Sequence, residues 1–277
     1  MRKHQIITIL LLPILFSYCK QKSEEKLISD KVENLEPKVN LNEIETDFIQ
    51  WWTYHSNNIS LSSNFIGVNE KSDTIDKEQF LEQLTSGDFI PLKLKSKDKI
   101  ETYKLYKLDA LADKSIGSTI KNESSTYLKH FNMEGKTFPK FDFTDLNGNH
   151  FNNENTKGKT TIFKTWFIGC TACVAEFPEL NKLVENHKNA NDIVFVSLAL
   201  DAKPELEKFL LKKPFKYQVV PVKKDFLEKK LNLQIYPTHI IVDKNGTIIK
   251  VVNKASEMIA FLENENRLTE KTPLPTM

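Results

Sequence analysis

Residues 160–178 read TTIFKTWFIGCTACVAEFP and contain the chain's one closely spaced cysteine pair, Cys170 and Cys173. The apolar run before the pair predicts a buried strand over residues 160–167, and the apolar spacing after it predicts a helix over residues 170–189. A strand that feeds a helix N-terminus directs backbone N–H groups and the positive end of the helix dipole at the first sulfur, which favours thiolate over thiol. We therefore predict that Cys170 is a redox nucleophile and that Cys173 closes a disulfide with it.

The rest of the sequence offers few other uses for these two sulfurs. The chain has three cysteines, and the third, Cys19, lies far away near the N-terminus. A structural zinc site is therefore short of thiolates, and the six histidines are isolated from one another. We expect no metal and no cofactor. Two incidental cysteines on a helix are the alternative, which the strand before the pair and the helix after it make less favourable.

The N-terminus predicts a secreted protein. Residues 1–18 combine a basic start with an apolar stretch, Ile6 to Phe16, that is too short to span a bilayer, so they indicate a removable signal peptide. The following LFSYCK at residues 15–20 resembles a bacterial lipobox, in which Cys19 becomes the lipid-bearing first residue. Tyr18 departs from that pattern, which prefers a small residue there, and an ordinary signal peptide with an incidental cysteine is the alternative. An oxidising compartment favours a catalytic role for the vicinal pair, because closing so short a loop adds little stability.

Composition divides the remaining chain into four parts. We expect a lipid anchor and flexible tether at 19–45, a small N-terminal domain of unknown role at 46–130, a second domain at 135–267 and a C-terminal tail at 268–277. The formal net charge is +2, and lysines alternate with acids, so neither a nucleic-acid-binding stripe nor a polybasic membrane patch is present.

Hydrophobic periodicity predicts different architectures for the two domains. The first domain reads as a small α+β unit with an aromatic cluster, residues 48–54, that we expect to be core. Its predicted elements are a helix over 74–84 capped by Asp76 or Thr74, strands over 89–94 and 100–108, and a helix over 115–131. The second domain alternates strands with helices and ends in a hairpin, which predicts a mixed sheet covered on both faces. Its predicted elements are a hairpin over 141–151, strands over 160–167, 193–200 and 217–222, helices over 170–189, 204–211, 225–231 and 256–267, and a hairpin of 238–242 with 247–252.

Residues 135–265 resemble the TlpA/ResA-like branch of thioredoxin-fold thiol-disulfide oxidoreductases. The resemblance rests on ordered motifs along the chain: Trp166, Cys170 and Cys173, Glu176-Phe177-Pro178, Tyr236-Pro237-Thr238, and Asp243-Lys244-Asn245-Gly246. It implies an α/β thioredoxin fold, with a mixed central sheet and helices on both faces, preceded by the small α+β domain.

The same resemblance implies roles for individual residues. Cys170 would attack a client disulfide and Cys173 would resolve the mixed disulfide, while Glu176 would tune the thiols, with a solvated helix-face glutamate as the alternative. A further group is implied to contact the substrate: Trp166, Gly169, Tyr236, Pro237 in the cis form, and the exposed backbone around Thr238. Gly169 replaces a tryptophan that is common in the family, and Pro178 is expected to bend the active-site helix.

Lys164 occupies the buried-strand position where thioredoxins often carry an acid. Its ammonium group would favour thiolate if it reached the sulfurs, and a lysine that snorkels from the sheet edge is the alternative.

We therefore expect a periplasm-facing oxidoreductase, anchored to a membrane by lipidated Cys19, that reduces protein disulfides with electrons from a membrane thiol donor. Three rivals stay open. A peroxiredoxin-type thiol peroxidase would usually have threonine where this chain has Phe167, and a Sco-type copper carrier would need His239 as a ligand. A non-catalytic binding module is the third.

Overall fold

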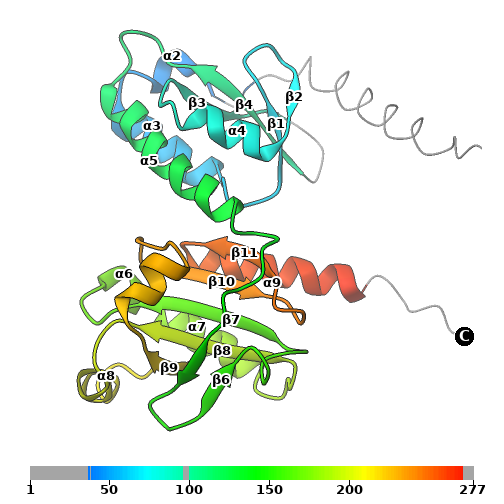
Figure 1. The fold of residues 1–277 in the computed structure, drawn as a ribbon. Helices are drawn as coiled ribbons and strands as arrows, with labels where there is room; N and C mark the ends of the chain where they lie inside the picture. The colour runs from blue at the N-terminus through cyan, green and yellow to red at the C-terminus, as the bar shows by residue number, and fades with distance from the viewer. Residues whose placement is uncertain (1–36, 38, 96–99, 271–277) are drawn as a thin grey trace, which may run out of the picture.

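The computed structural model describes residue 37, residues 39–95 and residues 100–270 (Figure 1). The predicted signal peptide, Cys19 with its predicted lipid and most of the predicted tether lie outside these residues. The tether prediction is too long at its C-terminal end, because Leu41–Ile44 form helix α2 and Ile44 is buried. Residues 268–270, predicted as tail, belong to the last helix. Within the described ranges, none of the helices has both the length and the apolar character needed to cross a bilayer.

The N-terminal region builds its own core on a four-stranded sheet of order β2-β1-β4-β3 (Figure 1). Strand β1 is parallel to β4, and the β1–β2 and β3–β4 pairs are antiparallel. Three longer helices begin after an aspartate whose side chain accepts backbone N–H groups of the first turn: Asp47, Asp76 and Asp113. The strands and longer helices are α3 Phe48–Asn58, β1 Phe65–Val68, β2 Thr74–Ile75, α4 Lys77–Leu84, β3 Phe89–Lys93, β4 Glu101–Lys107 and α5 Lys114–Phe131.

Two expectations for this region need correction. Thr74 starts strand β2 instead of capping the helix, and Asp76 is the cap. The aromatic cluster is only partly core, because Trp51 is completely buried whereas Ile49 is 67% and Trp52 41% exposed. Helix α3 accounts for the split, since its consecutive positions point to different faces.

Residues 137–270 form a thioredoxin fold around a five-stranded sheet of order β11-β10-β7-β8-β9. Strands β7, β8 and β9 run parallel, and β10 pairs antiparallel with both β7 and β11. The elements are β5 Asp142–Thr144, β6 His150–Asn152, β7 Thr160–Trp166, α6 Thr171–Ala175, α7 Phe177–Asn186, β8 Ile193–Ala199, α8 Lys203–Leu210, β9 Gln218–Pro221, the π-helical turn η1 Phe226–Lys230, β10 Thr238–Val242, β11 Ile248–Val252 and α9 Ala255–Glu270. The predicted mixed sheet is confirmed.

Alternation along β7 places side chains on both faces of this sheet. Ile162 packs with residues of α7 and α9 on one face, whereas Phe163 packs on the other face with Leu227 of η1 and Phe143 of β5. The hairpin turn at Asn147-Gly148 is confirmed, because Gly148 has a φ of 87°, a conformation that glycine adopts without strain. Both faces of the sheet are therefore packed, and the C-terminal ends of β7 and β8 lie at the edge of this core.

The two regions meet through buried polar contacts. Lys250 of β11 donates to the carbonyl oxygen of Ser62 at 2.5 Å and pairs with Glu134 at 3.2 Å. Tyr127 of α5 donates to Glu257 of α9 at 3.3 Å. These contacts tie the N-terminal region to the edge strand and last helix of the thioredoxin fold.

Candidate redox site

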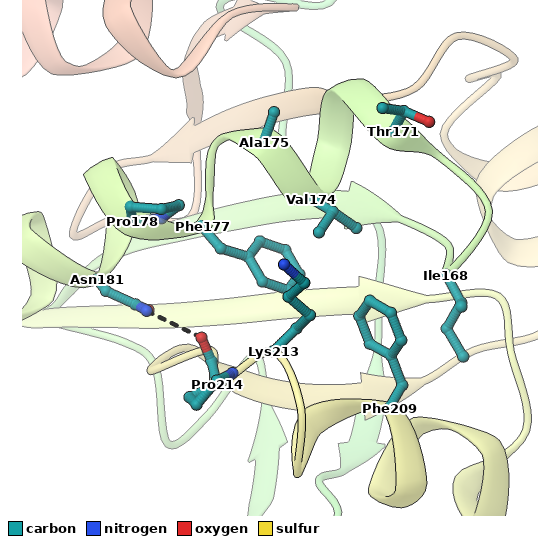
Figure 2. A pocket seen from close by; sticks show the side chains of 10 residues that line it. All are labelled: Ile168, Thr171, Val174, Ala175, Phe177, Pro178, Asn181, Phe209, Lys213 and Pro214. Atoms are coloured by element: carbon teal, nitrogen blue, oxygen red, sulfur yellow. Dashed lines mark hydrogen bonds between the residues drawn. The ribbon is translucent and has the colours of Figure 1, made fainter.

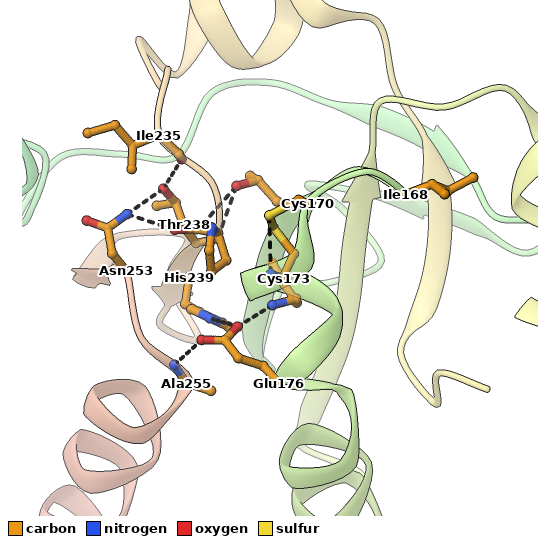
Figure 3. Close-up of a disulfide and its surroundings, with 12 residues drawn as sticks. Ile168, Cys170, Cys173, Glu176, Ile235, Thr238, His239, Asn253 and Ala255 are labelled. Atoms are coloured by element: carbon orange, nitrogen blue, oxygen red, sulfur yellow. Dashed lines mark hydrogen bonds and ion pairs between the residues drawn. A yellow bond between two sulfur atoms is a disulfide. The ribbon is translucent and has the colours of Figure 1, made fainter. Parts of the chain in front are cut away.

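The cysteine pair lies where β7 ends and α6 begins. Cys170 is the N-cap of α6, and it forms a disulfide with Cys173, with the two Cα atoms 5.2 Å apart (Figure 3). The backbone N–H of Cys173 donates to the Cys170 sulfur at 3.2 Å. Cys170 is 8% exposed and Cys173 is completely buried, so the first cysteine lies nearer to solvent than the second. This asymmetry fits an attacking Cys170 and a resolving Cys173.

The helix that follows the disulfide is interrupted. Residues 170–189 were predicted as one helix, but α6 ends after Ala175 and α7 begins at Phe177. Glu176 forms the joint, and Pro178 occupies the first turn of α7, where its missing N–H costs nothing. The expected bend is therefore confirmed, and it places the Glu176 side chain between elements instead of along a helix face.

Glu176 is held by three contacts from three different elements. Its Oε2 atom pairs with the ammonium group of Lys164 on β7 and lies 3.0 Å from Nε2 of His239 on β10. Its Oε1 atom accepts the backbone N–H of Ala255, at the start of α9, at 2.8 Å. Figure 3 shows the Glu176 carboxylate between His239 and Ala255, one helical turn from Cys173. The alternative of a solvated helix-face glutamate is wrong, since the side chain is only 16% exposed.

Both sequence-based readings of Lys164 need correction. Strand β7 is the central strand of the sheet and the Lys164 side chain is 0% exposed, so it does not snorkel to an edge. Its ammonium contact among the described residues is the Glu176 carboxylate, not a sulfur. Any influence of Lys164 on the thiols therefore acts through Glu176.

The charges of this cluster follow from burial and from its short contacts. Burial is the largest effect on Glu176 and raises its pKa, but the hydrogen bonds with His239 and Lys164 and the charge of Lys164 outweigh it and lower the pKa to about 2. Burial lowers the pKa of Lys164, against the opposing effect of Glu176. Burial also lowers the pKa of His239. Glu176 is thus ionised near neutral pH and His239 is neutral.

The loop before β10 reaches the disulfide from the other side. The Tyr236–Pro237 peptide bond is cis, as predicted. The Tyr236 ring packs edge-on against Phe167, with centroids 5.7 Å apart, and belongs to the apolar cluster that contains both cysteines. The side-chain amide of Asn253, a residue that the sequence did not single out, donates to the Pro237 carbonyl oxygen at 2.8 Å. This bond fixes the loop beside Thr238, which Figure 3 shows next to Cys170.

The structure separates the five predicted substrate contacts into two groups. Gly169 is exposed and Tyr236 is half-buried, so both can meet a partner. Trp166 is completely buried and packs edge-on against Phe177, so its predicted contact with substrate is wrong. Thr238 is also buried, and its backbone N–H and carbonyl oxygen both bond to Thr165, so the expected exposed backbone is absent there. Pro237 is buried as well.

Two more residues shape the site without having been predicted. Asp201, the second residue after β8, accepts the backbone N–H of Ile168 at 2.7 Å and holds the loop that precedes Cys170. The position of Asp201 in the sequence could have predicted its place in the site, because parallel strands such as β7 and β8 end at the same edge of a sheet. His239 was considered only as a copper ligand. It is buried on Glu176, and the described residues contain no group of three or more His, Cys, Asp or Glu side chains that could hold a metal ion.

Comparisons with known proteins find relatives for the second half of the chain. Residues 133–265 match the Redoxin family. The thiol-disulfide oxidoreductase ResA of Geobacillus kaustophilus is 26% identical over 118 residues, which cover 43% of this chain and 68% of ResA. ResA of Bacillus thuringiensis subsp. konkukian is 27% identical over 127 residues, covering 46% and 73%.

Among solved structures, a putative thiol:disulfide interchange protein DsbE from Chlorobium tepidum is 20% identical, with a TM-score of 0.43 over 48% of this chain and 96% of that one. The thioredoxin domain of a thiol-disulfide oxidoreductase from Bacteroides vulgatus is 23% identical, with a TM-score of 0.43 and the same two coverages.

Proposed function

Residues 133–265 are a TlpA/ResA-like thioredoxin domain of the Redoxin family, which makes the protein a thiol-disulfide oxidoreductase, and on this premise we propose that Cys170 and Cys173 are its catalytic pair. The observation that carries the proposal is the disulfide at the end of β7, in which Cys170 keeps a small exposed fraction and Cys173 is completely buried. Protein disulfides are the substrates, and reduction of the client is the proposed direction.

The reaction consists of two thiol-disulfide exchanges. The Cys170 thiolate attacks one client sulfur, so that a Cys170–client disulfide forms and the other client sulfur leaves as a thiolate. Cys173 then loses its proton and attacks Cys170, which releases the second client thiolate. Two electrons have passed to the client, and the enzyme holds the Cys170–Cys173 disulfide seen in the structure.

Glu176 is proposed to act on this cycle through charge. A carboxylate with a pKa of about 2 is a weak proton acceptor at neutral pH, so accepting the Cys173 proton is not its main role. A negative charge beside the sulfurs resists thiolate formation, and Lys164 compensates that charge within the core. Lys164 and His239 are therefore positioning residues, which act on the thiols through Glu176.

The surroundings of the catalytic domain are also proposals. We infer that residues 1–18 are removed, that Cys19 carries a lipid, and that a membrane thiol donor on the extracytoplasmic side re-reduces the enzyme. The basic and apolar N-terminus and the lipobox-like LFSYCK support this location. Separate hydrophobic cores support the division into domains at 46–130 and 135–267. A Cys19→Ser variant expressed in cells should move from the membrane fraction to the soluble fraction, and unchanged membrane association would exclude the lipid anchor.

A turnover assay on the purified protein tests the catalytic pair. With dithiothreitol as electron donor and insulin as disulfide substrate, the wild-type protein should reduce insulin faster than dithiothreitol alone, and Cys170→Ser should lower the rate to that of dithiothreitol alone. Cys19→Ser is the matched control because it removes the remaining thiol, and it should retain full activity. Insulin reduction by Cys170→Ser at the wild-type rate, above that of dithiothreitol alone, would overturn the proposal.

The same preparations separate this function from two of its rivals, the peroxidase and the binding module. Phe167, at the position where a peroxidase usually has threonine, packs its ring against Tyr236 instead of presenting a hydroxyl group. Consumption of hydrogen peroxide without reduction of insulin would favour the peroxidase. Absence of both activities, with the disulfide intact, would favour the binding module.

A further inference from the structure

An apolar groove of about 670 Å³ begins beside the redox pair (Figure 2). It runs between the α6–α7 segment on one side and the end of α8 with the loop that follows on the other. Its lining residues are Ile168, Thr171, Val174, Ala175, Phe177, Pro178, Asn181, Phe209, Lys213 and Pro214. Thr171 is exposed and lies between the two cysteines in the chain, so the groove is continuous with the surface at Cys170.

The groove is held in shape by hydrogen bonds across its floor. The Asn181 side chain donates to the Pro214 carbonyl oxygen at 3.0 Å and accepts the backbone N–H of Lys216 at 2.8 Å. The Phe177 ring that forms its wall is stacked on Phe215 at 4.0 Å between centroids. A pocket of this size that is fixed before binding loses little entropy when a ligand orders within it.

The lining has one charged side chain. Lys213 is exposed at the margin of the groove, and among the described residues its ammonium group takes part in no ion pair. Two lysines of the same segment do have acidic partners: Lys203 pairs with Glu207, and Lys216 pairs with Glu185. The surface therefore offers an apolar wall with an uncompensated positive charge at its rim, which complements an apolar residue next to an acid.

We propose that this groove docks the client polypeptide beside its reacting cysteine and takes an apolar side chain against Phe177 and Phe209 and an acidic side chain at Lys213. The inference rests on the proposed function, because a client chain that presents its sulfur to Cys170 can extend over the exposed Thr171, which lines the groove. The cis-proline loop contacts the client on one side of Cys170. On the other side, the groove binds the client side chains that lie next to the reacting cysteine.

Three synthetic peptides test this preference. Each contains one intramolecular disulfide, and they differ only in the residue pair that flanks both cysteines: Leu-Glu, Leu-Lys or Ser-Glu. The pre-reduced full-length protein is mixed with each, and the second-order rate constant for peptide reduction is measured in a single turnover, as the protein dithiol is converted to the Cys170–Cys173 disulfide. Burial of one leucine side chain should favour Leu-Glu over Ser-Glu about tenfold. Leu-Glu should exceed Leu-Lys several-fold at low salt, and this ratio should shrink in about 0.5 M salt.

Variants assign these ratios to the groove. Ala175→Phe places a ring inside the groove and should remove the leucine preference, whereas Glu179→Phe, on α7 outside the lining, is the matched control and should retain it. Lys213→Glu should invert the preference between Leu-Glu and Leu-Lys. Because Lys213 is an exposed loop residue, this variant is informative even if Ala175→Phe does not fold.

The outcomes separate the docking inference from the proposed function. Equal reduction of all three peptides by the wild-type protein would overturn the docking site and leave the oxidoreductase function intact. Equal effects of Ala175→Phe and Glu179→Phe, or a Lys213→Glu protein with unchanged ratios, would also overturn it. Failure to reduce either peptides or insulin would instead refute the proposed function.

Discussion

Replacing Lys164 by methionine is the most informative perturbation of the redox site, because it removes one buried charge and nearly preserves side-chain length. The Lys164 side chain is 0% exposed and that of its partner Glu176 is 16% exposed. In Lys164→Met the carboxylate keeps His239 and the N–H of Ala255 but loses the ammonium group. A buried charge is then left partly uncompensated, which is the costly way to break a buried pair.

The size of the effect follows from the carboxyl group itself. A pKa of about 2 in place of the ordinary 4.5 means that the partners, after the opposing effect of burial, favour the ionised form by a net of about 3 kcal/mol, at about 1.4 kcal/mol for each tenfold change in proton affinity. Lys164 supplies part of this, and its removal also ends the cost of burying an ammonium group. We therefore expect Lys164→Met to lower the free energy of unfolding by about 2 kcal/mol.

Urea denaturation of the oxidised protein at pH 7 measures this loss. The double variant Lys164→Met/Glu176→Gln should be more stable than the sum of the two single effects predicts, because the second change removes the orphaned charge. Lys229→Met is the surface control, since Lys229 pairs with Asp225 at 2.7 Å in solvent, and its midpoint should not change. Additive single effects, or a Lys164→Met protein as stable as the wild type, would refute the account of this cluster.

The same variant has a redox consequence. Without Lys164, the negative charge of Glu176 acts on the sulfurs without compensation and should raise the pKa of the Cys170 thiol in the reduced enzyme. Glu176→Gln should lower that pKa. The rate of iodoacetamide alkylation as a function of pH reports both, and identical profiles for wild type and Lys164→Met would remove Lys164 from the redox chemistry.

Three further outcomes are expected. The oxidised protein should lose stability as the pH falls below 6.5, because the unfolded chain protonates His239 there and the folded chain does not. It should lose more stability from pH 4.5 to about 2, where Glu176 becomes protonated. Equal urea midpoints at pH 7 and pH 4 would contradict this. Phe177→Ala should cost about 3–5 kcal/mol, because the ring is almost completely buried, and a change in Tm of less than a few degrees would be inconsistent with that packing. Lys250→Met should increase amide hydrogen exchange near Ser62, since it removes a contact between the two regions, and unchanged exchange there would show that this contact does not restrain them.

Local sequence signals predicted most of the thioredoxin fold. The buried strands stand out as apolar runs, and Asn-Gly dipeptides mark turns, so the ends of β7, β8 and β10 agree with prediction to within about a residue. Strands β1 and β2 escaped prediction because one has four residues and contains Gly67, and the other has only two residues. Strands this short are held by pairing with neighbours, which a one-dimensional pattern does not reveal.

The site was predictable only where its residues lie close together in the chain. Cysteine spacing located the disulfide, and Pro178 predicted the bend that follows. The cluster of Lys164, Glu176 and His239 joins three elements, and its geometry depends on strand register: Lys164 and His239 are direct partners in the β7–β10 pairing. Side-chain alternation then places both on the face that Glu176 reaches. Without that register, the lysine and the histidine look unrelated.

Trapping of the reaction intermediate tests the central claim most directly. Reduced Cys173→Ser protein is mixed with a disulfide peptide, and intact-mass and peptide-mass spectrometry identify the linkage. We predict one peptide joined to Cys170 in a stable mixed disulfide, and release of that peptide in the wild-type protein with formation of the Cys170–Cys173 disulfide. An adduct at Cys19, or no adduct while the peptide is still reduced, would contradict electron transfer through this pair.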